Sequence, residues 1–395
     1  MLLVSSWSRP FVKAAVITLF IGTSIGTIYM LLLSGINIHN ATISKIPLLH
    51  RELQSSAVTI LIMGVMYMLV PRIRSIKFKN LLEARISFIL IIASLILYTL
   101  AMYINNYYIT IAYVVRLTAL AIFAYVIASM LKVAPRVGRV SDYYFALALI
   151  MLIAYNVILA TDYNMDNLNR VYIWLCFVVY VIFGVQYKTV PIFFGRATPI
   201  KGLDILAFIL AVISALLLLI QIRVYAYTLL IATSVIFAYS IYVISKYRIP
   251  EFLYTSEDPQ AREKISRLKF FIPLLRISYV MLVLGLVTAL LYDLMPIFAL
   301  YDLAIHFVTI GFIGITIMNF IPIMLPPILG RSVNYTRFNM LPLIILLAGM
   351  VVRVAWNMLP LITQVDRLML GMSGFIVLLA MILYIRMIHS SMEPL

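Results

Sequence analysis

Two of the four histidines lie in long apolar stretches, where a polar ring requires a reason. His50 and His306 stand near the starts of such stretches, whereas His39 and His389 stand outside them. An ionisable side chain in an apolar segment is costly and marks a candidate functional site unless a neighbouring group satisfies it. Imidazole nitrogens from two facing helices can bind a haem iron on both sides. The alternatives are that each ring hydrogen-bonds a nearby carbonyl or takes part in proton-coupled transport.

The two histidines occupy equivalent positions of an internal repeat. His50 precedes Pro71 by 21 positions (71 − 50), and His306 precedes Pro327 by the same number. Related sequences end three apolar runs: GVMYMLVP at 64–71, GVQYKTVP at 184–191, and PIFFGR at 191–196 beside PPILGR at 326–331. Because these runs are the second, sixth and tenth, they predict three repeats of four helices, with units of about 1–135, 136–248 and 249–395.

The composition determines which elements must position these residues. Hydrophobic residues make up 65% of the 395 residues and charged residues 11%, and the mean hydropathy is +1.10. Such values exclude a soluble globular protein. Apolar runs long enough to cross a bilayer lie at about 11–33, 48–71, 82–104, 108–131, 142–160, 169–190, 203–222, 225–245, 270–292, 297–325, 338–358 and 368–388. We therefore expect an all-α polytopic membrane protein, with twelve transmembrane helices in one domain over 1–395.

The net charge of +16 is explained by topology rather than by nucleic acid. Lysines and arginines gather in alternate connections, in the order Arg72, Arg74, Lys77, Lys79, Arg85, Lys132, Arg136, Arg139, Lys188, Arg196, Lys201, Lys246, Arg248, Arg262, Lys264, Arg267, Lys269, Arg331 and Arg337. The opposite connections carry Lys45, Arg51, Arg170, Arg223 and Arg367. Basic loops face the cytoplasm. We expect a plasma-membrane protein in a lipid bilayer with both termini cytoplasmic, and no nucleic-acid partner.

The pattern of spans and histidines resembles the catalytic subunit I of haem–copper oxidases. The segments 50–54 and 62–72, with a histidine followed by a glycine and a proline, are similar to the second helix of that family, where the histidine ligates a low-spin haem. Residues 302–307 resemble its His-x-His motif, whose second histidine falls on His306. The chain also resembles the smaller NnrS-type membrane haem proteins. The resemblance implies twelve helices and a haem held by His50 and His306.

Departures from the family pattern limit what this resemblance implies. Ala304 stands where the first histidine of His-x-His would hold the second haem, and the sixth and seventh spans contain no histidine where the copper ligands would lie. A complete set of haem and copper ligands needs six histidines, and this chain has four. The single cysteine, Cys176, also excludes an iron–sulfur cluster. We expect one low-spin haem b, no copper and no oxygen reduction.

Two arginines deep in the apolar runs are candidates for contact with the haem. Arg116 lies about eight residues from the outer start of its apolar run, Arg353 lies similarly deep from the outer end of its own run, and both are on the same side of the membrane as the two histidines. Haem propionates are anions, and guanidinium groups bind carboxylates well. We expect Arg116 and Arg353 to bind the propionates. The alternatives are ion pairs with Glu52 or Asp302, or side chains that reach the outer headgroups.

These features favour a membrane b-type cytochrome subunit that transfers electrons through one bis-histidine haem within a respiratory complex. Two axial histidines leave the iron no open position, so we do not expect an enzyme on its own. The expected partners are other respiratory or cytochrome subunits on the outer face, as for the CbsB-type partners of archaeal cytochrome b that the chain resembles, and quinol is a candidate donor. The alternatives are a secondary transporter of an anionic substrate and an NnrS-type nitric-oxide response protein.

The predicted topology has a direct test. Cysteines introduced at Lys77 and Asn164 should react with a membrane-impermeant label from opposite faces, because Lys77 lies in one of the basic connections and Asn164 lies in one of the opposite connections. Labelling is measured on intact cells and on inverted vesicles. Reaction of both positions from one face would overturn the orientation and the depth assigned to the histidines.

Overall fold

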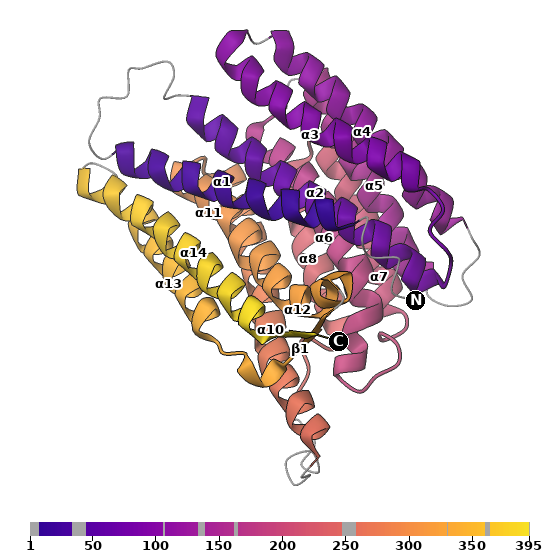
Figure 1. Ribbon diagram of the computed structural model, residues 1–395. Helices are drawn as coiled ribbons and strands as arrows, with labels where there is room; N and C mark the ends of the chain where they lie inside the picture. The colour runs from indigo at the N-terminus through magenta and orange to yellow at the C-terminus, as the bar shows by residue number, and fades with distance from the viewer. Residues whose placement is uncertain are drawn as a thin grey trace. The chain divides into compact units, whose positions relative to one another are not determined.

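The computed structural model describes residues 8–33, 45–105, 107–132, 139–161, 165–246, 258–329, 331–359 and 364–394. Nearly all of these residues are helical (Figure 1). The helices are α1 (Arg9–Leu33), α2 (Ile46–Arg74), α3 (Leu81–Ile104), α4 (Tyr107–Leu131), α5 (Arg139–Ala160), α6 (Asn167–Phe193), α7 (Leu203–Leu219), α8 (Arg223–Ser240), α10 (Pro259–Leu294), α11 (Phe298–His306), η3 (Phe307–Gly314), α12 (Ile315–Leu329), η4 (Tyr335–Arg337), α13 (Leu341–Asn357) and α14 (Gln364–Ser391), and the strands are β1 (Arg331–Val333) and β2 (Met392–Pro394).

The helices coincide with the predicted apolar runs. Within the described ranges, ten helices are long and apolar enough to cross a membrane, and the apolar helices α7 and α13 are shorter, at 17 residues each. The chain is therefore an all-α, multi-pass membrane protein. The number of twelve transmembrane helices and their arrangement as three repeats of four stay predictions. His39, Asn164 and residues 247–257 of the longest inner connection lie outside the described residues.

The chain packs as two compact units. Unit 1 comprises Met1–Val181 and Leu361–Phe375, and unit 2 comprises Ile182–Pro360 and Ile376–Leu395. His50 and Arg116 belong to unit 1, whereas His306 and Arg353 belong to unit 2. The division follows packing, so it does not test the predicted sequence repeat.

The core of unit 1 forms around α2. Figure 1 shows α3 and α4 side by side along their lengths, and α2 packs closely on α1. Tyr67 of α2 makes edge contacts with Phe11 of α1 and Phe123 of α4, at 5.6 and 5.2 Å between ring centroids. Its hydroxyl lies 2.8 Å from Ser87 Oγ on α3, which satisfies the buried polar end. These contacts hold the helix that carries His50 from three sides.

The core of unit 2 forms around α10. Its apolar cluster includes Phe270, Leu274, Ile315, Met318, Leu346 and Tyr384. The Tyr384 hydroxyl donates a 2.7 Å hydrogen bond to the Met318 carbonyl. At the chain end, β1 and β2 form an antiparallel pair in which Ser332 lies opposite Glu393. This cluster packs α10 against the helical segment that follows His306.

That segment changes its helical geometry directly after His306. The eight residues of η3 form a π-helix between α11 and α12. The turns of a π-helix are wider than those of an α-helix and are rare in proteins, and those that occur are often at functional sites. Two glycines let η3 approach α10 closely. A Cβ atom on Gly285 would lie 2.5 Å from Val308 Cγ2, and one on Gly311 would lie 2.6 Å from Met281 Cβ. Close packing on α10 therefore accompanies the change of geometry.

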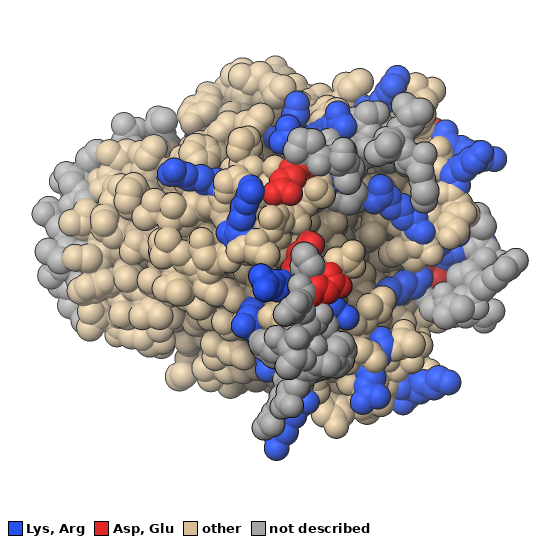
Figure 2. All heavy atoms as spheres, turned by 60° about the horizontal axis from the view of Figure 1, so that its bottom comes forward, with Lys and Arg blue, Asp and Glu red and all other residues tan. Residues whose placement is uncertain are grey.

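The outer faces of the helices suit contact with lipid. Ile17 of α1 and Leu82 and Ile89 of α3 are more than half exposed, as are many other large apolar side chains. Contiguous apolar surface of this kind requires a non-aqueous neighbour. Figure 2 shows one face, on which many lysine and arginine side chains (blue) lie and only a few acidic ones (red). Large areas between them consist of uncharged residues (tan). A bilayer is the environment that such a surface requires.

The packing of η3 on α10 predicts different effects at two neighbouring glycines. Gly311→Ala should destabilise the protein by about 1–3 kcal/mol, because the added methyl overlaps Met281. Gly314→Ala is the matched control: its Cβ atom would meet the Thr309 carbonyl oxygen at an ordinary 3.5 Å, and alanine favours a helix. Unfolding of the detergent-solubilised protein measures both, and equal stabilities would contradict the packing.

Candidate functional site

His50 is held by a neighbouring helix of unit 1. Its Nδ1 lies 2.7 Å from the Gly22 carbonyl oxygen on α1. The ring packs at Gly26, where an added Cβ atom would approach Nδ1 to 2.5 Å. One turn along α2, Gln54 Nε2 donates a 2.9 Å hydrogen bond to Thr23 Oγ1 on α1. The position of the His50 ring is thus determined by α1, which presents a bare backbone to it.

His306 is held within its own helix. It is the last residue of α11, with a side chain 19% exposed. Its Nδ1 lies 2.7 Å from the backbone carbonyl oxygen of Asp302, one turn earlier, and 3.2 Å from Asp302 Oδ1. The ring therefore shares its Nδ1 proton between a carbonyl and a carboxylate oxygen.

The Asp302 carboxylate is itself fixed by α13. Arg353 donates from Nε to Oδ2 at 2.7 Å and from Nη2 to Oδ1 at 2.6 Å. Asn357, one turn along α13, donates from Nδ2 to Oδ2 at 2.7 Å. All three side chains are buried. A bidentate, charge-assisted pair of this kind holds the carboxylate in one orientation.

These hydrogen bonds define the tautomer of both histidines. A carbonyl oxygen only accepts, so Nδ1 carries the proton in each ring and Nε2 of the neutral ring carries the lone pair. Metal-binding histidines usually donate their other ring N–H to a carbonyl or carboxylate in this way. Among the described residues, Nε2 of His306 has no hydrogen-bond partner. Both rings are thus in the state that an axial ligand needs.

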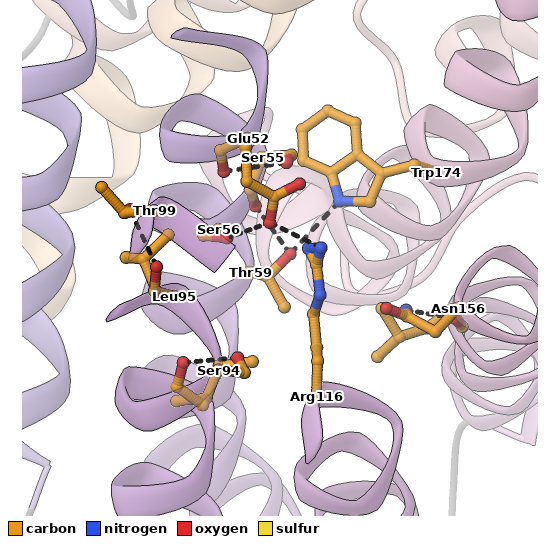
Figure 3. A network of polar contacts seen from close by, with 12 residues as sticks. Glu52, Ser55, Ser56, Thr59, Ser94, Leu95, Thr99, Arg116, Asn156 and Trp174 are labelled. Carbon is orange, nitrogen blue, oxygen red and sulfur yellow. Dashed lines mark hydrogen bonds and ion pairs between the residues drawn. The ribbon is translucent and has the colours of Figure 1, made fainter. Parts of the chain in front are cut away.

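Arg116 meets a carboxylate in the interior of unit 1. Its Nη2 lies 2.5 Å from Glu52 Oε1, and its guanidinium carbon lies 5.1 Å from the centre of the Tyr113 ring. Figure 3 shows Arg116 rising from α4 toward Glu52, with hydroxyl side chains of α2 around the pair. Ser56 Oγ donates to the same carboxylate oxygen at 3.2 Å. Both members of the pair are buried.

The same row of polar side chains on α2 extends to α6. Trp174 Nε1 donates a 3.2 Å hydrogen bond to Thr59 Oγ1, and Thr59 Oγ1 donates to the Ser55 carbonyl at 2.8 Å (Figure 3). Glu52, Ser55, Ser56 and Thr59 recur at intervals of three and four residues, so they share one face of α2. This face is buried and polar although the helix lies in an apolar bundle.

The structure brings together some of the predicted site residues. His50 lies in the unit that contains Arg116, and His306 lies within the network of Arg353. Both arginines form the ion pairs with Glu52 and Asp302 that the sequence offered as an alternative to propionate binding. Each histidine also makes the carbonyl hydrogen bond that was considered for it, and this bond is compatible with metal binding. Propionate binding and ligation of iron stay predictions.

Sequence reasoning did not assign the residues that orient the histidines. Gly22 and Gly26, four residues apart on α1, had a recognisable signal, because small residues at this spacing allow close helix approach in membranes. Asp302 also had one, since a residue four positions before His306 lies on the same helix face. The acceptor role of the Gly22 carbonyl had no signal, because backbone groups are invisible in sequence.

The described residues include no group of three or more histidine, cysteine, aspartate or glutamate side chains that could hold a metal ion. A bis-histidine haem needs only two protein ligands, because the porphyrin supplies the others. Each of the two histidines, within its own unit, thus has the kind of nitrogen that an axial haem ligand supplies.

Comparison with known proteins adds no family: no protein-family model matches the chain, and no curated protein matches it.

The buried pair of Asp302 and Arg353 predicts a large coupling energy. Arg353→Ala should destabilise the protein by about 3–5 kcal/mol, because it leaves a buried carboxylate without its cation. The double variant Asp302→Ala, Arg353→Ala should recover much of this loss. The half-exposed pair of Arg337 and Glu393 is the control, with about 0–1 kcal/mol expected. Denaturant unfolding measures the cycle, and additive effects at Asp302 and Arg353 would contradict the pairing.

Proposed function

We propose that the protein is a b-type cytochrome subunit of a respiratory complex, in which Nε2 of His50 and Nε2 of His306 ligate one low-spin haem. The observation that supports this most directly is the hydrogen bond of each Nδ1 to a backbone carbonyl at 2.7 Å. The acceptor is on another helix for His50 and on the same helix for His306, yet both hydrogen bonds leave the lone pair on Nε2. A role confined to packing would not require the same nitrogen to be protonated in both rings.

The haem would supply one-electron redox chemistry, and the chain would hold it. If both histidines held the haem, no ligand position would remain for a substrate, which favours electron transfer over catalysis. The residues contribute orientation: Gly26 leaves space for the His50 ring, and Asp302 fixes the His306 ring. No side chain of the site is assigned a catalytic role.

Arg116 and Arg353 remain the proposed propionate ligands. A guanidinium group has five N–H donors in a planar fork, so one group can lie between two carboxylates. Glu52 receives the Nη2 bond of Arg116, and Asp302 receives two bonds of Arg353. In the proposed site these carboxylates hold the two guanidinium groups in place, and the propionates share the positive charge of those groups.

The proposed setting follows from the charge distribution. With basic connections on the cytoplasmic side of the plasma membrane and both termini inside, His50 and His306 lie toward the outer face. Electron transfer there requires a partner on that side, such as another cytochrome, a copper or an iron–sulfur subunit. Quinol dissolved in the bilayer is a candidate electron donor.

A transporter of an anionic substrate has weaker support. It would need helices broken at mid-membrane. Instead α11, η3 and α12 follow one another without a break in helical structure. An NnrS-type nitric-oxide response would be favoured if one of the two histidines were dispensable for haem binding.

Optical spectra of the purified chain test the proposal. The wild type should give a six-coordinate, low-spin haem in both redox states, because imidazoles on both faces produce a strong ligand field. His50→Ala and His306→Ala should each convert it to high spin or lose it. Gly26→Leu should do the same with both histidines present, since its side chain would occupy the position of the His50 ring.

His389→Ala is the control and should leave the spectrum unchanged, because His389 is exposed at the end of α14. Metal analysis should give iron without stoichiometric copper. An unchanged haem spectrum in the His50→Ala, His306→Ala double variant, or a wild-type chain without haem, would refute the proposal and favour the transporter.

A further inference from the structure

One arginine of unit 2 is held by aromatic rings instead of a carboxylate. The guanidinium carbon of Arg267 on α10 lies 5.3 Å from the centre of the Phe193 ring on α6 and 5.9 Å from the centre of the Tyr335 ring in η4. Its Nε is buried without a hydrogen-bond partner. In the described part of the chain no carboxylate pairs with this arginine, and Glu393 of β2 pairs with Arg337 instead.

The two ring contacts leave the charge of Arg267 uncompensated. An aromatic ring attracts a cation through the negative face of its π system but carries no net charge. The rings therefore order the side chain without neutralising it. They also offer no lone pair to the planar N–H donors of the guanidinium group, which fit the oxygens of a phosphate. Arg267 is partly exposed, so an anion has access to it from the surface.

The charges around this arginine also favour an anion. The segments 258–269 and 331–337, which contribute the arginine and one of its rings, contain six basic residues and two acidic ones. The Asp258 carboxylate caps the start of α10, and the Glu263 side chain is exposed. The local charge is therefore positive, and it attracts a ligand with a net negative charge.

Arg267 lies where the apolar part of unit 2 ends. The apolar run of α10 begins three residues after it, and Phe193 is the last residue of α6. Aromatic rings gather here: Phe271 stacks on Phe193 with 3.9 Å between centroids, and Phe338 stacks on Tyr335 with 5.1 Å between centroids. Aromatic side chains are enriched at the membrane–water boundary, which is the depth of the lipid headgroups.

Exposed apolar side chains follow these aromatic residues along the chain. Ile192 directly precedes Phe193, and Leu341 begins α13 three residues after Phe338. Both side chains are more than half exposed. A cation beside apolar surface suits a phospholipid, which has both a phosphate and acyl chains, better than free phosphate, which has no apolar part.

We propose that Arg267, Phe193 and Tyr335 form a binding site for the phosphate of an anionic phospholipid, with an acyl chain along the apolar surface at Ile192. The rings hold the guanidinium group, and its N–H donors bind the phosphate oxygens. The basic surroundings favour an anionic lipid over a zwitterionic one. The site goes beyond electron transfer and does not require a bound haem, so its test is independent of the proposed function.

Titration of the purified full chain in detergent tests the site. The probe is dioctanoyl phosphatidylglycerol, and dioctanoyl phosphatidylcholine is the zwitterionic comparison. A ligand that binds the folded state raises the unfolding temperature, so phosphatidylglycerol should raise it more than phosphatidylcholine does. In Arg267→Gln the affinity for phosphatidylglycerol should fall by about tenfold or more, because the charge-assisted hydrogen bonds to the phosphate are lost.

Lys264→Gln is the matched control. It removes the same charge from an exposed position one turn earlier on α10, so the affinity should fall by less than about twofold. Arg267→Lys keeps the charge but lacks the planar fork of donors. Its affinity should still fall several-fold, and this variant provides the test if Arg267→Gln does not fold.

Three results would overturn the proposal. Equal losses of affinity in Arg267→Gln and Lys264→Gln would reduce the effect to general attraction by a basic surface. Wild-type affinity in Arg267→Lys would exclude recognition by the planar guanidinium group. Inorganic phosphate is the third arm: if it stabilises the wild type at the concentrations at which phosphatidylglycerol acts, the ligand is free phosphate rather than a lipid.

Discussion

A charge inside an apolar bundle must have its partner within hydrogen-bond distance, because neither lipid nor apolar side chains can replace water around it. The buried ion pairs of this protein follow from that constraint. Arg116 meets Glu52, Arg353 meets Asp302, and Arg74 at the end of α2 meets Asp142 on α5 at 2.5 Å. Each pair joins two helices, so the need to compensate a charge also determines which helices are neighbours.

The same constraint prepares the histidines. An imidazole N–H that is partly buried among apolar helices needs an acceptor. The acceptor is a carbonyl of α1 for His50, and the backbone carbonyl and nearby carboxylate of Asp302 for His306. Satisfying Nδ1 leaves the lone pair on Nε2. The need to satisfy the Nδ1 proton thus produces the tautomer that metal ligation uses. At His306 the carboxylate near the ring belongs to Asp302, which in turn is held by its ion pair with Arg353.

Close helix approach depends on the absence of side chains at a few positions. Gly26 leaves space on α1 for the ring of His50. Gly285 and Gly311 leave space for the side chains of Val308 and Met281, so that α10 and η3 pack closely. In a bilayer the hydrophobic effect does not drive helices together, so close van der Waals contacts of this kind supply much of the free energy of helix association. The orientation of the His50 ring and the packing of η3 on α10 therefore each depend on glycines.

The sequence by itself determined the class of the protein and the positions of its helices. Hydropathy is a property of each segment alone, so the apolar runs at 48–71 and 297–325 predicted α2 and the α11–α12 span, and the histidines and deep arginines were visible as polar residues within such runs. Only the tertiary structure decided how those residues are satisfied. Arg116 and Glu52 are 64 residues apart, and Arg353 and Asp302 are 51 apart, so their pairing depends on which helices pack together. The role of the Gly22 carbonyl and the π-helix after His306 are features of the backbone. They depend on how the helices pack, so the pattern of side chains in the sequence does not predict them.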